Sequence, residues 1–532
     1  MNGLTLRRAL APCALALSLV ASVANAAPPS LRPAGTPVDG PYFVLAGSMH
    51  DHSFDSDGHA RGEDILSWEA AHRYELGIDF ASLTDHSDFF PIGGNSLATE
   101  QSLATTPDFV WPHQATLLGQ YAGQNGFTML RGFEYTSDQE NHLNVIGSQN
   151  WAQPVANHAG DLTMAFFYNW LKSHPTPDPA GLGAGYGGND GIGQFNHPDS
   201  KGALNFDDYA YDASVAPYMS TIEMFGDQGY PGGLHRSDGG WYWFALSQGW
   251  TVGPVMDWDN HYWNDKIAAV NPGSRCGSGA YLPCERSLVF AAQNTRPAIM
   301  DALRARRTGA TQFPGLWAAV RSGNTWMGST IAVRPGKRFF VTVDAGSDVN
   351  PLQSVEIVSD NGVSPFPYFY GDNLACNATP IAYGGNLNPN CLPEEIGHSS
   401  LAISYALQHE KYVRTNGHAT RKDIIDAPPT GTTVARLGLR GARETVCVPV
   451  AMPTVASTRP DGKHFFYAVV TAADGSRAWT APLLVTPASG GTGGGDRGDD
   501  ARAGSADGCS ATSGLPKGNG DDARTRTIRV IR

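Results

Sequence analysis

The sequence predicts an α/β protein in which a parallel sheet or barrel is followed by an antiparallel β-sandwich. The chain has 532 residues, of which 41% are hydrophobic, so it can build a large core and roughly two to four domains. From about residue 41 to 262, short apolar runs alternate with helix-like stretches, which favours parallel strands. From about 310 to 486, short runs rich in Val, Phe and Tyr alternate with turn residues, which is typical of a sandwich.

Residues 1–26 have the pattern of a secretory signal. Arg7 and Arg8 form a charged end, an apolar run follows, and Ala24-Asn25-Ala26 fits the small-residue rule for cleavage. A membrane anchor is the alternative, but the apolar run is shorter than the roughly 20 residues that a spanning helix needs. We therefore expect cleavage after Ala26, a secreted or periplasmic protein, and no membrane span.

The first domain is expected to cover residues 27–295, and seven apolar runs are its predicted strands. In chain order they are YFVLAGSM (42–49), IDFASLT (78–84), FTMLRGF (127–133), HLNVIG (142–147), GIGQF (191–195), STIEMF (220–225) and WTVGPVM (250–256). Between the first two, GEDILSWEAAHRYELG (62–77) has the periodicity of a helix.

The segment 296–309 is predicted to be a helix that links the two regions, because Pro297 lies near its start and Gly309 at its end. The β-sandwich is expected over 310–486, with STIAVRP (329–335), KRFFVTVDA (337–345), SVEIVSD (354–360) and KHFFYAVVTA (463–472) among its strands. Residues 487–532 are rich in Gly, Asp, Ser and Arg without apolar periodicity, so we expect a disordered tail.

The cysteine count suits an oxidising compartment. The sequence has seven cysteines, and removal of Cys13 with the signal leaves six. Pairing of sequence neighbours would give three disulfides, Cys276 with Cys284, Cys376 with Cys391, and Cys447 with Cys509. A thiolate zinc site is the alternative, but no pair has the two-residue spacing that structural zinc sites usually show.

The charge balance argues against binding to nucleic acid. Acidic residues outnumber basic ones, 50 against 37, and the formal net charge is -13. A chain of this charge has no long-range field that would gather a polyanion. We expect a small-molecule partner instead.

Residues that can bind a metal follow most of the predicted strands of the first region. Side chains that leave the carboxyl ends of neighbouring strands converge, so these positions can form one site. The nine candidates are His50, His52, Asp57, His86, Glu134, His142, His197, Asp259 and His261. His142 differs in that it opens its strand, and other histidines, such as His72 and His113, do not follow a strand.

The donor types indicate transition metals. Residues two apart in a strand point to the same side, so His50 and His52 can bind one ion together. Imidazole nitrogen with carboxylate oxygen suits zinc, manganese or ferrous iron better than calcium or magnesium. Nine ligands are too many for one ion, so we expect two or three, with Glu134 able to bridge them.

These residues lie in motifs that resemble those of the PHP family, which is named for its polymerase and histidinol-phosphatase members. The motifs are HDHSFDSDG, LTDHSD, GFEYT, NHLNVIG, FNHPDS and DNH, and they span roughly residues 43 to 265. FNHPDSKGALNF, IEMFGDQG, GWTVGPVMDWDNH and ALRARRTGAT resemble more narrowly a secreted bacterial branch near carbaryl-hydrolase-like PHP proteins. The resemblance implies a distorted (β/α)7 barrel, a centre of two or three metals, and hydrolysis.

The resemblance also assigns positions. The family's ligands fall on the nine residues named above, with Asp57 in the place where many members have a histidine. We expect catalytic roles for Glu134, His86 and Asp259, and for Asp85 a role in orienting a histidine or in proton transfer. Asp257 has the same two possible roles.

The expected reaction is hydrolysis of a small ester by a metal-bridged hydroxide, most simply a phosphoester. Phosphate esters usually also need cations, and the candidates are Arg61, Arg131, Lys201 and Arg236. A carboxylic ester, carbamate or amide is the alternative substrate for the same centre. A metal-stabilised binding module, whose sandwich contacts carbohydrate or the cell envelope, is the alternative of another class.

Overall fold

The structure is a computed structural model that describes several stretches of the chain. These are residues 36–37, 40–90, 110–123, 126–137, 140–154, 164–178, 185–198, 205–224, 240–263, 284–348, 350–360, 432–439 and 441–488. The predicted signal, nearly all of the predicted tail, Lys201 and Arg236 lie outside these ranges. Each predicted disulfide also has at least one cysteine outside them, so the pairing stays a prediction.

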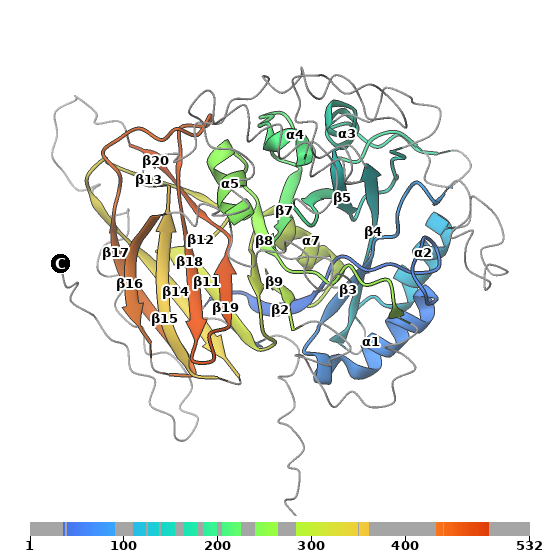
Figure 1. Cartoon of the computed structure of the whole chain (residues 1–532), viewed down its shortest axis with the longest axis horizontal. Coiled ribbons are helices and arrows are strands. Elements are labelled where there is room, and N and C mark those ends of the chain that lie inside the picture. Colours follow the sequence, from blue (N-terminus) through green and yellow to red (C-terminus); the bar gives the residue numbers. More distant parts are fainter. Residues whose placement is uncertain are drawn as a thin grey trace, which may run out of the picture. The chain divides into compact units, whose positions relative to one another are not determined.

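Each of the seven predicted strands of the first region is present (Figure 1). They are β2 (Phe43–Ser48), β3 (Phe80–Leu83), β4 (Thr128–Ser137), β5 (Asn141–Ile146), β6 (Ile192–Phe195), β7 (Met219–Glu223) and β8 (Gly253–Val255). Their order in the sheet follows the chain, from β2 to β8. Almost every residue of these strands is buried, as expected for a sheet covered on both faces.

The sheet is mixed, which corrects the expectation of parallel strands throughout. β2, β3 and β4 are parallel, and so are β6, β7 and β8, but β5 is antiparallel to both of its neighbours. Only residues 138–140 separate β4 from β5. So short a connection allows a hairpin but not the crossover that a parallel pair requires.

The two ends of this strand series approach each other at their tips. The N–H of Asp259, beyond β8, donates to the carbonyl of His50 at 2.8 Å, and the N–H of His52 donates to the carbonyl of Asn260 at 3.2 Å. The remaining edge of β2 pairs antiparallel with β9 (Arg286–Ala291). The closed (β/α)7 barrel therefore stays a prediction, whereas the large mixed sheet is observed.

Six helices lie in the described part of the chain. They are α1 (Gly62–Leu76), α2 (Val110–Gln120), α3 (Met164–Leu171), α4 (Asn205–Tyr209), α5 (Gly240–Gln248) and α7 (Arg296–Arg304). α1 confirms the predicted helix and ends where Gly77 adopts a φ of 67°, with its N–H bonded to the carbonyl of Arg73. None of the described helices is long and apolar enough to cross a membrane.

The predicted linker helix is shorter than expected, because α7 ends at Arg304 rather than at residue 309. The chain turns at Arg306, whose φ is 54°, and its guanidinium donates to the carbonyls of Thr251 and Ala216 at 2.8 and 2.7 Å. Thr308 then begins strand β10 (Thr308–Thr311). These hydrogen bonds fix the turn against the first region.

The second region contains the predicted strands, and they pair antiparallel except for one pair, residues 330–333 with 484–487, which is parallel. One sheet has four strands, β11 (Leu316–Ser322), β12 (Thr325–Trp326), β14 (Arg338–Ser347) and β17 (Arg443–Ala451). Facing it are β13 (Thr330–Val333), β15 (Leu352–Ser359), β16 (Thr432–Gly438), β18 (His464–Ala472), β19 (Arg477–Thr480) and β20 (Leu483–Pro487). Val343, Val448 and Phe466 belong to the core that the two sheets share.

The two regions are joined through the sheet itself. β10 pairs with β9 on one side and with β19 on the other, both antiparallel, so one sheet runs from the first region into the second. β1 (Thr36–Pro37) adds a short pairing to β2. Aromatic side chains complete the junction, where Trp243 of α5 meets Phe465 of β18. The predicted boundaries at 295 and 310 stay predictions.

We expect the buried face of α7 to contribute strongly to stability. Leu303 is fully buried beside Ile299 in one core cluster, whereas the side chain of Asp301 is 75% exposed. Leu303→Ala should lower the free energy of unfolding by about 2–5 kcal/mol, because it leaves a cavity. Asp301→Ala should change it by less than about 0.5 kcal/mol. Urea denaturation of both variants checks this, and equal effects would contradict it.

A buried acid on α1 predicts a pH dependence. Burial, offset in part by the charge of Arg286, raises the pKa of Glu69 from 4.5 to about 8. Between these values the folded state holds a proton that the unfolded state releases, so this group makes stability fall as pH rises. Glu69→Gln should therefore lose less stability between about pH 5 and 8. Urea denaturation across that range measures it, and identical pH profiles for the two proteins would count against it.

Candidate metal centre

All nine predicted ligands come together at one place in the fold. His50 and His52 follow β2, His86 follows β3, His197 follows β6, and Asp259 and His261 follow β8. Glu134 lies within β4, His142 lies within β5, and Asp57 lies in the loop after His52. The strand tips therefore gather these side chains from six strands.

The nine side chains form four overlapping groups in which the ligand atoms lie within 4.8 Å of one another. The groups are His50, Glu134 and His197; His86, Glu134 and His142; His50, His52 and Asp259; and His52, Asp57, His86 and His261. Because the groups share members, they suit several ions held side by side rather than one.

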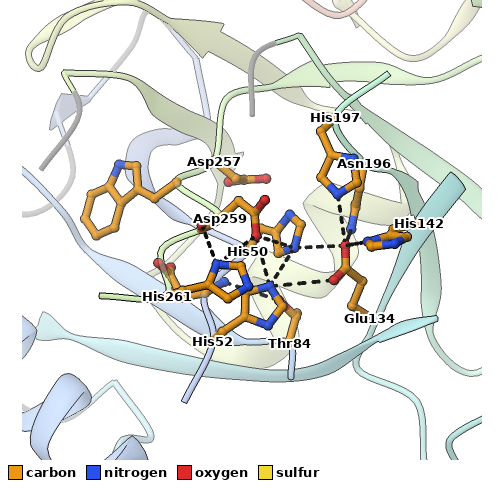
Figure 2. Close-up of polar contacts among 12 residues, drawn as sticks. His50, His52, Thr84, Glu134, His142, Asn196, His197, Asp257, Asp259 and His261 are labelled. Atoms are coloured by element: carbon orange, nitrogen blue, oxygen red, sulfur yellow. Dashed lines mark hydrogen bonds and ion pairs between the residues drawn. The ribbon is translucent and has the colours of Figure 1, made fainter. Parts of the chain in front are cut away.

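Glu134 stands between two sets of histidines (Figure 2). Its Oε1 lies 3.1 Å from His50 Nε2, 3.1 Å from His142 Nδ1 and 3.2 Å from His197 Nε2. Its Oε2 lies 2.7 Å from His86 Nδ1. The two oxygens thus face different histidines, which is the arrangement of a carboxylate that bridges two ions.

The spacing between donor atoms fits a coordination shell. His52 Nε2 lies 3.2 Å from His50 Nε2 and 3.0 Å from Asp259 Oδ1. Donors bound at about 2.0 to 2.2 Å around one ion are separated by about 2.8 to 3.6 Å, from octahedral to tetrahedral geometry, and both distances lie in this range. Two imidazole nitrogens that face each other need a shared proton or a cation between them, so the residues fit a bound metal.

The group around Asp57 is the most exposed part of the centre. Asp57 Oδ1 lies 3.3 Å from His261 Nε2 and 3.4 Å from His86 Nε2. The side chains of Asp57 and His261 are 36% and 21% exposed, whereas those of His50 and Glu134 are fully buried. Solvent therefore reaches the centre from the side of Asp57 and His261.

Electrostatics in the centre favour cations. Burial would raise the pKa of Glu134, but His142, His50 and His86 hold it well below its ordinary value. Burial, helped by His261 and His86, lowers the pKa of His52 to about 3. Burial would lower the pKa of His86, but Glu134 raises it from 6.5 to about 9. Without a metal the negative charge is therefore balanced in part by protonated histidine, and a metal ion that binds imidazole nitrogen releases these protons.

Two of the candidate ligands have strained backbones. His197 has a φ of 24° and Asp259 a φ of 46°, a region that residues other than glycine rarely adopt. Such strain persists only where the surrounding structure imposes it, and it concentrates at functional sites. The fold thus fixes these two side chains at some energetic cost.

Glu223 supports the centre and was missed from the sequence. His50 Nδ1 donates to Glu223 Oε1 at 2.7 Å, which selects the tautomer whose Nε2 faces Glu134 and Asp259. The N–H of His197 also donates to Glu223. Glu223 is the last residue of β7, so the same strand-tip pattern that marks the nine ligands could have found it.

Asp85 and Asp257 bind groups behind the ligands. Asp85 Oδ1 accepts from the N–H of Ser53 at 2.6 Å and from the hydroxyl of Ser56 at 2.8 Å. Asp257 accepts from the N–H of Met49 at 2.7 Å and from the hydroxyl of Ser287 at 2.6 Å. These contacts favour a role in holding the backbone around His50 and His52.

The two predicted cations within the described residues are engaged elsewhere. The guanidinium of Arg131 lies 4.0 Å from the ring centroid of Trp111 and donates to the carbonyl of Ser148 at 3.2 Å. Arg61 lies 3.4 Å from Glu63 at the start of α1, and its side chain is 47% exposed. Both contacts fit structural or surface roles.

We expect Glu223→Gln to weaken metal binding by about 10- to 100-fold, the usual cost of losing a partner that orients a ligand. The amide keeps the volume of the side chain but loses the charge that fixes His50. Competition with a chelator of known affinity measures the change. Glu75→Gln, an exposed change on α1, is the control. Equal affinities in the two variants would remove Glu223 from the centre.

Comparisons with known proteins found no matching protein-family model and no matching curated protein. One similar solved structure, from Bacteroides vulgatus, is a two-domain protein that contains a predicted PHP-like metal-dependent phosphoesterase. It is 14% identical, with 85% of this chain and 98% of that chain covered and a TM-score of 0.33. Another is an AA10 lytic polysaccharide monooxygenase from Streptomyces lividans, 12% identical, with 30% and 58% covered and a TM-score of 0.14. At these TM-scores the function has to be argued from the residues of the chain itself.

Proposed function

We propose that the protein is a metal-dependent hydrolase of small phosphoesters. The observation that carries the proposal is the position of Glu134, whose two oxygens face separate sets of histidines in a buried centre with nine potential ligands. Adjacent divalent ions, when bound, lower the pKa of water and neutralise charge that develops on a displaced ester. Zinc, manganese and ferrous iron suit this mixture of nitrogen and oxygen donors.

The side chains of the centre have different roles according to their burial. Glu134 and the buried histidines supply a fixed frame, while the partly exposed side chains of Asp57 and His261 mark the side on which an ester can enter. His86 lies between the two, because Nδ1 faces Glu134 and Nε2 faces Asp57. His52 Nδ1 lies 3.4 Å from the hydroxyl of Ser56, which leaves Nε2 facing His50 and Asp259 as a ligand atom.

One observation favours the alternative of a carboxylic ester, carbamate or amide substrate. Of the four predicted cations, the two that lie in the described residues are bound to other groups, Arg131 to Trp111 and Ser148, and Arg61 to Glu63. A neutral ester needs no cationic clamp, whereas a phosphoester gains from one. The several metal positions offset this deficit, and they keep the phosphoester as the first proposal.

We also propose that the protein is secreted or periplasmic in a bacterium, with residues 1–26 as its signal. The composition of that segment and the even number of cysteines after its removal support this. The sandwich has no comparable ligand group among its described residues. We therefore propose that it supports the first region or contacts carbohydrate or the cell envelope.

A single set of assays tests the proposed function. The mature protein is stripped with a chelator, reloaded with zinc, manganese or ferrous iron, and assayed on aryl phosphate monoesters, aryl phosphate diesters and aryl carboxylic esters. We expect turnover to disappear on chelation, to return with metal, and to be fastest on a phosphoester. Turnover of carboxylic esters alone would establish the alternative substrate class, and turnover that survives chelation would contradict a metal-dependent hydrolase.

Glu134→Gln is the sharpest variant for this assay. The amide cannot supply negative charge to two sets of ligands, so we expect reduced metal content and turnover near the uncatalysed background. Glu75→Gln, exposed on α1, should behave as the unaltered protein. Elemental analysis is run beside the assay. Full metal content with near-normal turnover in Glu134→Gln would remove Glu134 from the centre.

A further inference from the structure

The partly exposed candidate ligand Asp57 lies in a loop that folds back on the chain after His52. The N–H of Phe54 donates to the carbonyl of Ala60 at 2.8 Å, and the N–H of Gly58 donates to the carbonyl of Ser53 at 2.9 Å. A Cβ atom at Gly58 would lie 2.5 Å from the backbone of His52, so only glycine allows this close return. The loop, residues 53–58, thus brings Asp57 to its position from outside the sheet.

One side of this loop is tied to the strand tip below it. Asp85 accepts from the N–H of Ser53 at 2.6 Å and from the hydroxyl of Ser56 at 2.8 Å. Gln114 of α2 donates to the second oxygen of Asp85 at 2.9 Å. This end of the loop is therefore anchored by buried side chains.

The other anchor is His113, the neighbour of Gln114 on α2. Its Nδ1 lies 3.0 Å from Asp55 Oδ2 and its Nε2 lies 2.9 Å from Glu63 Oε1. A histidine with a carboxylate at each nitrogen donates from both, and although burial works against it, Asp55 and Glu63 raise its pKa to about 9. His113 thereby joins the loop, α1 and α2.

The loop matters because Asp57 belongs to only one of the four ligand groups. The other three groups consist of side chains on or directly after strands, and each of them includes His50 or Glu134. Asp57 depends instead on the loop for its distance of 3.3 Å from His261. A loop that is held less firmly should therefore affect the outermost metal position first.

We propose that His113 is a positioning residue for the outermost metal ion, which it secures by holding Asp55 and hence the loop that carries Asp57. The inference rests on the metal centre of the proposed function but not on its substrate. Retention of that ion then also depends on α2, a helix that supplies none of the nine ligands.

The test measures metal content and the affinity of the most weakly held ion in the full mature chain loaded with manganese or zinc. His113→Ala should bind one ion fewer after dialysis, with an affinity for that ion about 10- to 100-fold weaker. His72→Ala is the control, because His72 lies on α1 and its Nδ1 bonds only to the carbonyl of Trp68, one turn earlier. The control should keep all of its ions.

Two amide variants show which carboxylate contact of His113 is needed to retain the outermost ion. The amide of His113→Asn can replace Nδ1 and reach Asp55, whereas the amide of His113→Gln can replace Nε2 and reach Glu63. We expect the Asn variant to keep the outer ion better than the Gln variant. Combining Asp55→Asn with His113→Ala should cost no more than the larger single change, because both act through one contact.

Unchanged affinity in His113→Ala, equal loss of every ion, or equal loss in the Asn and Gln variants would each overturn the inference. The Asn and Gln variants also serve if His113→Ala does not fold, which circular dichroism detects. Because the readout is metal content, a failure to turn over any ester would count against the proposed function alone.

Discussion

The buried carboxylate of Glu134 is the group on which the rest of the centre depends. It has no exposure to solvent, and histidines from the tips or edges of four other strands lie 2.7 to 3.2 Å from its oxygens. An ionised carboxylate in such a place is costly unless positive charge surrounds it. The oxygens of Glu134 face several histidines and its pKa is low, and imidazole nitrogens of neighbouring histidines face each other. These features indicate a site whose charge is balanced by cations, and the spacing of the donor atoms fits divalent ions.

The fold delivers this arrangement through strand tips and secures it with contacts from behind. β2 and β8 bring His50, His52, Asp259 and His261 together, and backbone hydrogen bonds between the two tips fix their separation. Glu223 then orients His50. The positive φ angles of His197 and Asp259 show that the fold imposes a strained backbone where it positions these two side chains. The loop that carries Asp57 is held from two sides, by Asp85 directly after β3 and by His113 of α2, which also contacts Glu63 of α1.

Much of this could be predicted from the sequence, because strand periodicity and ligand chemistry are local properties. The seven strands of the first region, α1 and the convergence of nine side chains followed from apolar runs and from what comes after each run. The antiparallel direction of β5 was not predicted, because a pattern of apolar runs does not encode strand direction. Only the short connection at 138–140 excludes a parallel crossover between β4 and β5. The early end of α7 depends on Arg306 binding distant carbonyls. Glu223 ends β7 and fits the strand-tip pattern, whereas His113 is recognised only through its contacts with Asp55 and Glu63, which lie far away in the sequence.

The central claim is that several metal ions share these nine ligands around Glu134. Anomalous diffraction from crystals of the native protein, collected at the absorption edges of zinc, manganese and iron, tests it most directly. The account predicts two or three peaks in the centre, with the carboxylate of Glu134 between two of them and one peak beside Asp57 and His261. One peak, or none among these side chains, would contradict it.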